Sequence, residues 1–379
     1  MYVAIPKELD DLEPRVAATP SSIKQLIKSG LNIYVESGAG LDSFISDDDY
    51  KNSGATIVSS SEDLLNNADI TLKVLPPLEE EIKLLKEKSI FISLCQTTRE
   101  LETVHLLSKK RITAFSMHLI PRTTLAQKMD ALSSQANIAG YKAVLIAASR
   151  LGVYMPLLMT AAGTIRPSKV LIIGAGVAGL QAIATAKRLG AQVEAFDVRP
   201  VVKEQVESLG AKFIEVESDK DDGIGEGGYA KETSEDYKKK QQALIHEHIS
   251  KSDAVITTAL IPGKPAPLLI PRNMVESMKP GSVIMDLAAE NGGNCELTQK
   301  DEVIYHKQII IDGTSNLPGS MPVHATELYS KNVSAFLTYM MKEGKLDLDL
   351  EDEIISGALF SHEGKITHVP TKELLDKKK

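Results

Sequence analysis

Residues 170–180 read Val-Leu-Ile-Ile-Gly-Ala-Gly-Val-Ala-Gly-Leu, and this stretch decides the fold of the chain. Its first four residues are apolar and predict a buried strand, and residues 180–189 predict a helix. Between them, Gly174, Gly176 and Gly179 have the Gly-x-Gly-x-x-Gly spacing. In such a strand–loop–helix unit the first glycine makes a tight turn, the second lets a pyrophosphate approach the backbone, and the third lets the helix pack closely. The helix N-terminus offers N–H groups to the phosphates, so we expect a dinucleotide-binding loop.

An acidic residue follows the next predicted strand. Asp197 comes directly after Phe196 and lies 18 positions beyond Gly179. A carboxylate at this place hydrogen-bonds the adenosine ribose and repels a 2′-phosphate, which favours NAD over NADP. Arg199 keeps NADP open as the alternative, because an arginine near this position accepts a 2′-phosphate. A second glycine pair at residues 38–40 lacks the third glycine, and we interpret it as a plain turn.

The remaining sequence alternates strand-like and helix-like segments, which is typical of mostly parallel α/β sheets. Strands are expected at Tyr2–Ile5, Asn32–Glu36, Ile70–Val74, Ser89–Leu94, Lys169–Ile173, Gln192–Phe196, Lys212–Glu215, Ala254–Thr257, Ser282–Asp286 and Gln308–Asp312. Helices are expected at Ser21–Ser29, Glu79–Lys88, Leu180–Leu189 and Val202–Leu209, as one or two helices within residues 121–150, and after Pro318. A polar insertion covers residues 217–240, and the lysine-rich tail from Asp376 is expected to be solvated.

This alternation predicts an α/β protein with two Rossmann-like domains, each built on a mostly parallel sheet. The length of 379 residues suits two domains of roughly 150 residues each. The domain with the glycine loop is expected at residues 138–319. The other domain is expected to be discontinuous, with residues 1–137 completed by the C-terminal segment, residues 320–379.

Composition argues against several classes of function. The formal net charge is -8 and no basic stripe stands out, so nucleic acid is not an expected partner. Cys95 and Cys295 lie far apart and indicate neither a disulfide framework nor a metal site, which fits a reducing compartment. The N-terminus lacks the pattern of a signal peptide. No apolar stretch reaches the roughly 18 residues of a transmembrane helix, so none is expected.

Four longer motifs carry a resemblance to a known family. Residues 121–141 read Pro-Arg-Thr-Thr-Leu-Ala-Gln-Lys-Met-Asp-Ala-Leu-Ser-Ser-Gln-Ala-Asn-Ile-Ala-Gly-Tyr, and residues 227–232 read Gly-Gly-Tyr-Ala-Lys-Glu. Residues 257–267 read Thr-Thr-Ala-Leu-Ile-Pro-Gly-Lys-Pro-Ala-Pro, and Asp-Leu-Ala at 286–288 precedes Gly-Gly-Asn-Cys at 292–295. Together they resemble the soluble NAD(H)-binding component (alpha subunit, domain I) of proton-translocating NAD(P) transhydrogenase. The resemblance covers nearly the whole chain, and its first stretch resembles the family's Arg-Gln-Asp loop.

The resemblance implies roles for individual residues. In the family the arginine, glutamine and aspartate of this loop hold the nicotinamide and its ribose, and they correspond to Arg122, Gln127 and Asp130, the expected catalytic residues. Gly228 and Tyr229 correspond to a mobile loop that closes over bound nucleotide. The expected cofactor-binding residues are Arg122, Thr123, Thr124, Leu125, Gln127, Ser133, Gly174, Gly176, Val177, Gly179, Asp197, Val198, Arg199, Gly228, Tyr229, Gln241 and Leu260.

The reaction that the resemblance implies suits these residue types. Hydride passes directly from NADH on this chain to NADP+ on a partner subunit, and membrane-spanning subunits couple the transfer to proton translocation. No general base is needed, because the protein has only to position two nicotinamides and exclude water. The resemblance further implies a homodimer without a metal, docked to NADP(H)-binding and membrane-spanning partners. It would be peripheral on the cytoplasmic face of a bacterial inner membrane.

Two alternative functions remain. Alanine dehydrogenase shares this architecture, and its chemistry needs an arginine, a lysine and a histidine for an amino-acid substrate. Arg15 and Lys73 stand at fitting places, but residues 91–97 contain no histidine, which argues against amino-acid oxidation. We interpret both cations as structural remnants, with Lys73 at a solvated strand end. The second alternative is an NAD-sensing regulatory subunit, for which the Arg-Gln-Asp loop is not required.

Overall fold

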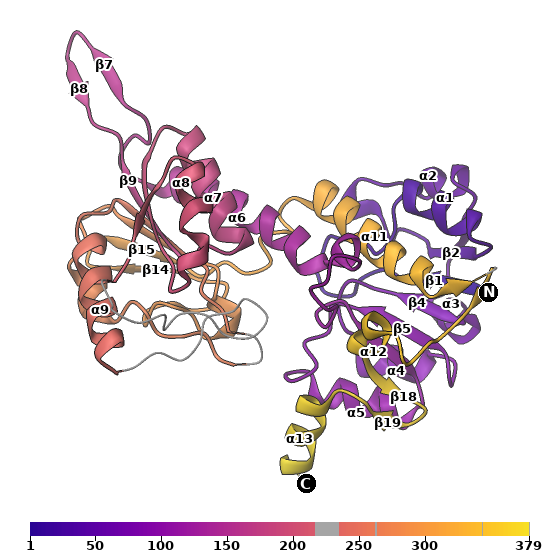
Figure 1. The fold of residues 1–379 in the computed structure, drawn as a ribbon. Coiled ribbons are helices and arrows are strands. Elements are labelled where there is room, and N and C mark those ends of the chain that lie inside the picture. The colour runs from indigo at the N-terminus through magenta and orange to yellow at the C-terminus, as the bar shows by residue number, and fades with distance from the viewer. Residues whose placement is uncertain (217–234, 262–263, 343, 379) are drawn as a thin grey trace. The chain divides into compact units, whose positions relative to one another are not determined.

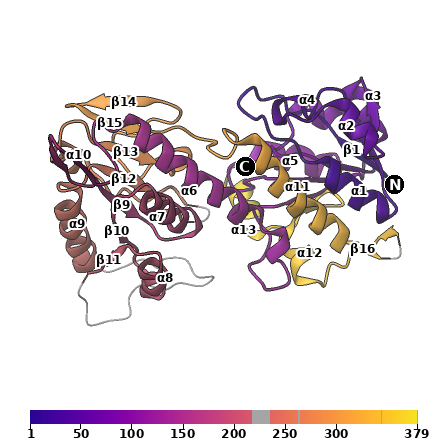
Figure 2. The same cartoon turned by 90° about the horizontal axis from the view of Figure 1, so that it is seen from above.

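The computed structural model describes residues 1–216, 235–261, 264–342 and 344–378. The chain forms two compact units, one of Met1–Gln135 with Pro318–Lys379 and the other of Ala136–Leu317. The boundaries expected from the sequence lie two residues further along the chain at each junction. Each unit contains one large sheet covered by helices (Figures 1 and 2).

Unit 2, residues 136–317, is a seven-stranded sheet with the order β11-β10-β9-β12-β13-β15-β14. Its strands are β9 (Lys169–Ile173), β10 (Gln192–Phe196), β11 (Lys212–Ile214), β12 (Ala254–Thr257), β13 (Val283–Asp286), β14 (Val303–His306) and β15 (Ile309–Asp312). All neighbours are parallel except β14 and β15. The chain runs outward from β9 through β10 to β11 and then returns to β12 on the other side. The space above β9 is therefore a topological switch point, where open α/β sheets bind ligands.

Alternating side chains of β9 build two separate cores in unit 2, because successive residues of a strand face opposite sides of the sheet. Val170 and Ile172 pack in the core that includes residues of α6, α7 and α8. Leu171 and Ile173 pack in the core that includes residues of α9 and α10. The helices of this unit are α6 (Ala131–Arg150), which begins in unit 1, α7 (Val177–Arg188), α8 (Lys203–Ser208), α9 (Glu235–Ile249) and α10 (Arg272–Glu276). A separate antiparallel hairpin consists of β7 (Leu158–Thr160) and β8 (Gly163–Ile165).

Unit 1 is an eight-stranded sheet with the order β19-β18-β6-β5-β4-β1-β2-β3. Its strands are β1 (Tyr2–Ile5), β2 (Asn32–Glu36), β3 (Thr56–Val58), β4 (Ile70–Leu72), β5 (Ile90–Ser93), β6 (Thr113–Ser116), β18 (Leu359–His362) and β19 (Lys365–Ile366). The first six are parallel and have the Rossmann order 3-2-1-4-5-6. β18 pairs antiparallel with β6. The C-terminal segment thus completes the first sheet, which confirms the predicted fold class.

Helices cover both faces of the unit 1 sheet. Ile90 and Ile92 of β5 pack with residues of α1 and α11, whereas Phe91 packs with residues of α3, α4 and α5. The helices are α1 (Pro20–Lys28), α2 (Asp47–Asn52), α3 (Ser61–Asn67), α4 (Glu79–Leu84), α5 (Leu101–Lys109), α11 (Pro322–Tyr339), α12 (Glu353–Ala358) and α13 (Val369–Lys378). A short hairpin of β16 (Met341–Lys342) and β17 (Lys345–Leu346) follows α11. Among the residues that the structure describes, no helix has the length and apolar character of a membrane span.

Two sequence-based expectations about elements need correction. Residues 121–126 are not helical, because the chain forms only the 3-10 turn η2 (Gln127–Met129) before α6 begins at Ala131. The polar insertion ends earlier than expected, since α9 already begins at Glu235. The tail is expected to be solvated, and its side chains at Asp376 and Lys377 are exposed at the end of α13.

Candidate functional site

The glycine loop joins β9 to α7, and glycine is needed at its three positions for three different structural reasons. Gly174 has a φ of +101°, which L side chains rarely adopt. A Cβ at Gly179 would lie 1.8 Å from the carbonyl oxygen of Gly174, so only glycine allows the helix to approach the loop this closely. A Cβ at Gly176 would meet no atom within 4 Å, so the backbone there borders open space. This is the arrangement expected when a ligand approaches the backbone at the second glycine.

The N-terminus of α7 lies at the switch point beside β9. Its N-cap is Gly176, and no side chain caps the first turn of this helix. The first amides of a helix have no partner within the helix and carry partial positive charge. Val177, the first residue of α7, is exposed. The loop and helix therefore present backbone N–H groups to an anion at the carboxyl end of the sheet.

Asp197, which follows β10, is bonded to the glycine loop. Its Oδ2 accepts a hydrogen bond from the backbone N–H of Ala175 at 2.7 Å. Arg199 binds the same carboxylate, with Nε donating to Oδ1 and Nη2 to Oδ2, both at 2.9 Å. The backbone N–H of Arg199 also donates to Oδ1. The guanidinium thus grips the carboxylate in a two-point arrangement, which is a geometrically specific form of ion pair.

Thr258 lies on the opposite side of the glycine loop, directly after β12. Its Oγ1 donates to the carbonyl oxygen of Gly174 at 3.0 Å, and its backbone N–H donates to that of Ile173 at 2.8 Å. Leu260, one of the expected nucleotide contacts, follows two residues later and is exposed. Thr258 lies in the motif at residues 257–267 but is not among the contacts expected from the sequence. The signal was a hydroxyl directly after a predicted strand, and it becomes interpretable only once β12 is known to be a neighbour of β9.

The other expected residues of unit 2 have mixed positions. Val198 is partly buried and packs against the hydrophobic core. Gln241 lies in α9 and is buried. Gly228 and Tyr229 lie outside the described residues. The structure therefore brings together Gly174, Gly176, Val177, Gly179, Asp197 and Arg199.

The expected Arg-Gln-Asp loop belongs to unit 1. Some of its side chains are exposed, whereas others are buried and anchor the loop to the core. Ala126 and Met129 belong to the core of this unit, and Asn332 donates to the carbonyl oxygen of Lys128 at 2.9 Å. Exposed residues lie between these buried residues. The exposed members of the expected set are Arg122, Thr124, Leu125 and Gln127, and Thr123 is partly buried. The loop is thus fixed by its backbone and presents several side chains to solvent.

Asp130 and Ser133 are brought together at the start of α6. The Oδ1 atom of Asp130 accepts a hydrogen bond from the backbone N–H of Ser133 at 2.8 Å, and Oδ2 accepts one from its hydroxyl at 2.6 Å. The side chain of Asp130 therefore satisfies an amide of the first helical turn, as a capping residue does. This contact orients the carboxylate and the hydroxyl together.

The switch point of unit 1 is filled by charged side chains of the chain itself. Glu8 follows β1 and Lys73 follows β4, the two strands on either side of the switch. Lys73 Nζ lies 2.6 Å from Oε1 of Glu81 and 3.5 Å from Oε2 of Glu8, and its side chain is 2% exposed. Tyr329 donates its hydroxyl to the backbone oxygen of Lys73. The expectation of a solvated strand end at Lys73 is wrong, because two carboxylates from other elements make burial of this cation possible.

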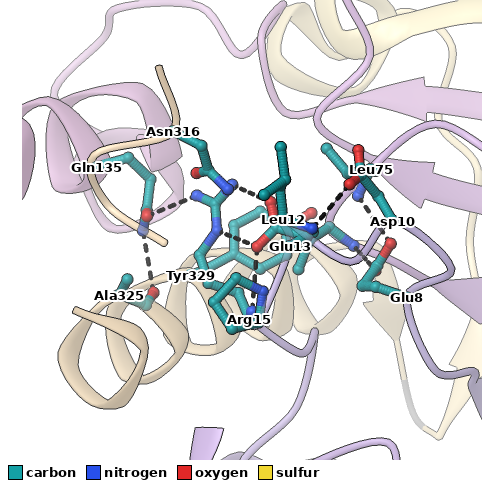
Figure 3. A network of polar contacts seen from close by, with 12 residues as sticks. Glu8, Asp10, Leu12, Glu13, Arg15, Leu75, Gln135, Asn316, Ala325 and Tyr329 are labelled. Atoms are coloured by element: carbon teal, nitrogen blue, oxygen red, sulfur yellow. Dashed lines mark hydrogen bonds and ion pairs between the residues drawn. The ribbon is translucent and has the colours of Figure 1, made fainter. Parts of the chain in front are cut away.

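Arg15 is buried in the same unit and is likewise paired (Figure 3). Its Nε donates to Oε1 of Glu13 at 2.7 Å, and its Nη2 donates to Oε2 of Glu13 at 2.5 Å. Its Nη1 donates to Oε1 of Gln135, whose amide in turn donates to the carbonyl oxygen of Ala325. Both cations that an amino-acid substrate would need are therefore bound by internal carboxylates.

Burial changes the protonation of two groups near these cations. Desolvation raises the pKa of Glu8 to about 7, although Lys73 and the backbone N–H of Val74 oppose the shift. Desolvation, assisted by the positive charge of Arg15, lowers the pKa of His118 to about 4. Within the described part of the chain, no group of three or more His, Cys, Asp and Glu side chains could hold a metal ion.

Comparison with known families matches both halves of the chain. Residues 4–139 match the family described as "Alanine dehydrogenase/PNT, N-terminal domain", and residues 143–369 match "Alanine dehydrogenase/PNT, C-terminal domain". The second match crosses from unit 2 into the C-terminal segment of unit 1.

Three relatives are similar over almost their whole length. The chain is 46% identical over 376 residues to the first part of NAD(P) transhydrogenase subunit alpha of Rhodospirillum rubrum, covering 97% of this chain and 98% of that protein. A solved transhydrogenase structure from Sinorhizobium meliloti is 45% identical, with a TM-score of 0.87, and covers 97% of this chain and 100% of that one. A solved L-alanine dehydrogenase is 25% identical, with a TM-score of 0.85, and covers 100% of this chain and 99% of that one.

Proposed function

The chain belongs to the alanine dehydrogenase/PNT family and is a relative of transhydrogenase alpha subunits, and from this premise we propose that it is the NAD(H)-binding component of a proton-translocating NAD(P) transhydrogenase. The observation that carries the proposal is the glycine loop. It is open at Gly176, leads into an uncapped helix N-terminus and is bonded to Asp197. These features together suit the pyrophosphate and adenosine ribose of a dinucleotide.

The preference for NAD over NADP rests on the contacts of Asp197. Its carboxylate is held in place by Ala175 and Arg199 at the end of β10, where the adenosine ribose is expected. A ribose hydroxyl donates to a carboxylate, whereas a 2′-phosphate is repelled by it. Arg199 would have to leave this two-point contact before it could receive a 2′-phosphate. These contacts support NAD as the cofactor of this chain, with NADP(H) bound by a partner subunit.

The nicotinamide end is assigned to the exposed loop of unit 1. Arg122, Gln127 and Asp130 are proposed to hold the nicotinamide and its ribose, and Ser133 the carboxamide. Side chains that bind a ligand have to be accessible on a fixed backbone, and the buried anchors of this loop meet that need. The further proposed contacts are Thr123, Thr124, Leu125, Val177, Val198, Gly228, Tyr229, Gln241 and Leu260.

The proposed reaction is a direct hydride transfer between NADH and NADP+. The residues of this chain need neither donate nor accept a proton, so their work is to orient the nicotinamide and keep water away from it. Coupling to proton translocation is assigned to membrane-spanning partner subunits. The chain would then act on the cytoplasmic face of the inner membrane as a peripheral component.

A homodimer is also proposed, and the β7–β8 hairpin supports it. Among the described residues the two strands pair only with each other, and Figure 1 shows them extending away from the sheet of unit 2. Met159 on the first strand is 72% exposed, Leu157 just before that strand is 53% exposed, and Ile165 on the second strand is exposed as well. Exposed apolar clusters of this kind typically mark protein–protein contacts.

Alanine dehydrogenase activity is the competing function, and the buried ion pairs count against it. An amino-acid carboxylate would have to compete with Glu13 for Arg15, and with Glu8 and Glu81 for Lys73. Removing a carboxylate from a buried pair leaves an uncompensated charge, which is costly. An NAD-sensing regulatory subunit remains the non-enzymatic alternative.

Nucleotide titration tests the proposal directly. We expect the fluorescence of NADH to change on binding to the purified chain, with NADPH binding at least about tenfold more weakly, a difference of roughly 1.4 kcal/mol. Glu194→Gln, on the strand that precedes Asp197 but paired with His248, is the control and should keep this ratio. Equal affinities for the two nucleotides would overturn the role of Asp197.

A further inference from the structure

Asp286 is a completely buried carboxylate at the end of β13, next to the candidate nucleotide site. It is paired in register with Thr257, and Thr257 is in turn in register with Ile173, the residue before the glycine loop. The last residues of three neighbouring strands are therefore Ile173, Thr257 and Asp286. The proposed function assigns no role to Asp286, although a buried carboxylate needs several donors to be stable.

Five donors surround the Asp286 carboxylate. Oδ1 accepts from the hydroxyl of Thr257 at 2.8 Å and from the backbone N–H of Ala288 at 3.0 Å. Oδ2 accepts from the hydroxyl of Thr298 at 2.7 Å and from the backbone N–H groups of Asn294 and Cys295 at 2.8 and 3.0 Å. Four of these donors belong to residues 288–298, so Asp286 holds this segment in place and fixes the backbone of Asn294.

Asn294 is completely buried, and its side-chain amide forms hydrogen bonds with the backbone after β12. Its Oδ1 accepts from the backbone N–H of Ala259 at 3.1 Å, and its Nδ2 donates to the carbonyl oxygen of the same residue at 2.9 Å. Nδ2 also donates to the carbonyl oxygen of Pro267 at 2.9 Å. An asparagine side chain offers two donors and an acceptor, so all of its hydrogen-bonding groups are used on the backbone of this one segment.

Ala259, which Asn294 holds by these hydrogen bonds, lies between two residues of the candidate site. Thr258, on one side of Ala259, donates to the carbonyl oxygen of Gly174. Leu260, on the other side, is a proposed nucleotide contact. A chain of contacts therefore leads from Asp286 through Asn294 and Ala259 to the glycine loop. Hydrogen bonds join Asp286 to Asn294, Asn294 to Ala259 and Thr258 to Gly174, and the peptide bond between Thr258 and Ala259 completes the path within unit 2.

We infer that Asn294, held by Asp286, is a positioning residue for the nucleotide site, since it fixes the backbone of Thr258–Leu260 against the glycine loop. The inference rests on the proposed function, because it concerns the same site. Asn294 does not touch the nucleotide in this account. Its contribution is to keep the wall beside Gly174 in place before the nucleotide arrives, which lowers the cost of ordering on binding.

The test compares Asn294→Ala with Thr298→Val in NADH titrations followed by fluorescence. Asn294→Ala releases Ala259 and should raise the dissociation constant for NADH about tenfold. Thr298→Val removes one donor to the same carboxylate without touching Ala259, so it should change this constant less than about twofold. At saturating NADH, both variants should show the emission spectrum and the stoichiometry of the unaltered protein.

Several outcomes would overturn the inference. It fails if Asn294→Ala lowers the melting temperature but leaves NADH affinity unchanged, or if both variants weaken binding equally. If Asn294→Ala does not fold, Asn294→Asp takes its place, because it keeps the size and the acceptor but loses both N–H donors. Unchanged affinity in that variant would contradict the inference equally. Absence of NADH binding by the unaltered protein would instead refute the proposed function.

Discussion

Buried charges in unit 1 show how single residues depart from their usual behaviour. Lys73 and Arg15 are cations, whereas Glu8, Glu13 and Glu81 are carboxylates, so this buried group has one acid more than it has bases. An uncompensated charge is expensive in the interior of a protein. A proton on one carboxylate removes the excess, and because burial raises the pKa of Glu8 to about 7, Glu8 is the carboxylate expected to hold that proton below this pH.

The raised pKa of Glu8 predicts a particular dependence of stability on pH. Between about pH 4.5 and 7 the folded protein keeps the proton on Glu8, whereas the unfolded chain releases it. The folded state then binds more protons, so the contribution of Glu8 to stability decreases as the pH rises through this window. His118 acts in the opposite direction between about pH 4 and 6.5, because its folded pKa is lowered.

Glu8→Gln separates the two effects. We expect its free energy of unfolding to improve relative to the unaltered protein as the pH rises from 4.5 to 7. The difference should change by an amount on the order of 2 kcal/mol, at about 1.4 kcal/mol per pKa unit. Urea titrations at several pH values measure it, with the exposed Glu102→Gln as the control. A difference that stays constant over this range would contradict the protonation of Glu8.

At the scale of elements, one glycine of the loop is needed for stable packing and another for the proposed nucleotide binding. Gly179 is required because helix α7 lies against the carbonyl oxygen of Gly174, whereas Gly176 faces open space. The two positions have the same residue type for different reasons, and substitution by alanine distinguishes them.

We predict that Gly179→Ala destabilises unit 2, because its Cβ would collide with backbone at 1.8 Å. Overpacking of this kind costs typically 1–3 kcal/mol, and about the upper end is expected here. Gly176→Ala should leave the melting temperature nearly unchanged but weaken NADH binding about tenfold or more, since its methyl group occupies the space of the pyrophosphate. Thermal melts and NADH titrations of both variants provide the measurement. If Gly176→Ala bound NADH normally, the pyrophosphate would not lie there.

Much of the fold could be predicted because its strands are short apolar runs bounded by turn residues. The predicted limits of Lys169–Ile173, Gln192–Phe196 and Ala254–Thr257 match those of β9, β10 and β12. A short hairpin-like piece is expected near the C-terminus, but local pattern could not place β18 beside β6, because that pairing joins residues more than 240 positions apart. The short hairpin β7–β8 was missed as well, since its strands bury no apolar face.

Parts of the candidate site could likewise be predicted from the sequence, whereas other parts required the structure. The place of Asp197 follows from its spacing to the glycine loop, but its contact with Arg199 depends on side-chain geometry. Burial of Lys73 could not be predicted, because its partners Glu8 and Glu81 come from other elements and lysine alone favours solvent. The contacts of Thr258 and Asn294 likewise require the order of the strands.

At the scale of the whole molecule, the exposed hairpin predicts how copies of the chain associate. Met159→Glu places a charge on the exposed hairpin and should convert a dimer into monomers, because burying an unpaired charge at an interface is costly. Light scattering after gel filtration should show the mass fall from two chains to one. Tyr305→Glu, on β14 and as exposed as Met159, places the same charge outside the hairpin and serves as the control. A dimer that survives Met159→Glu would exclude the hairpin as its contact.

This chain is proposed to hold one nicotinamide for hydride exchange with another on a partner. The most direct measurement mixes the purified chain with an NADP(H)-binding transhydrogenase component, NADPH and an NAD analogue whose reduced form has a distinct absorbance. We predict reduction of the analogue only when both proteins and NADPH are present. Formation of NADH from NAD+ and L-alanine by this chain alone, without transfer from NADPH, would contradict the account.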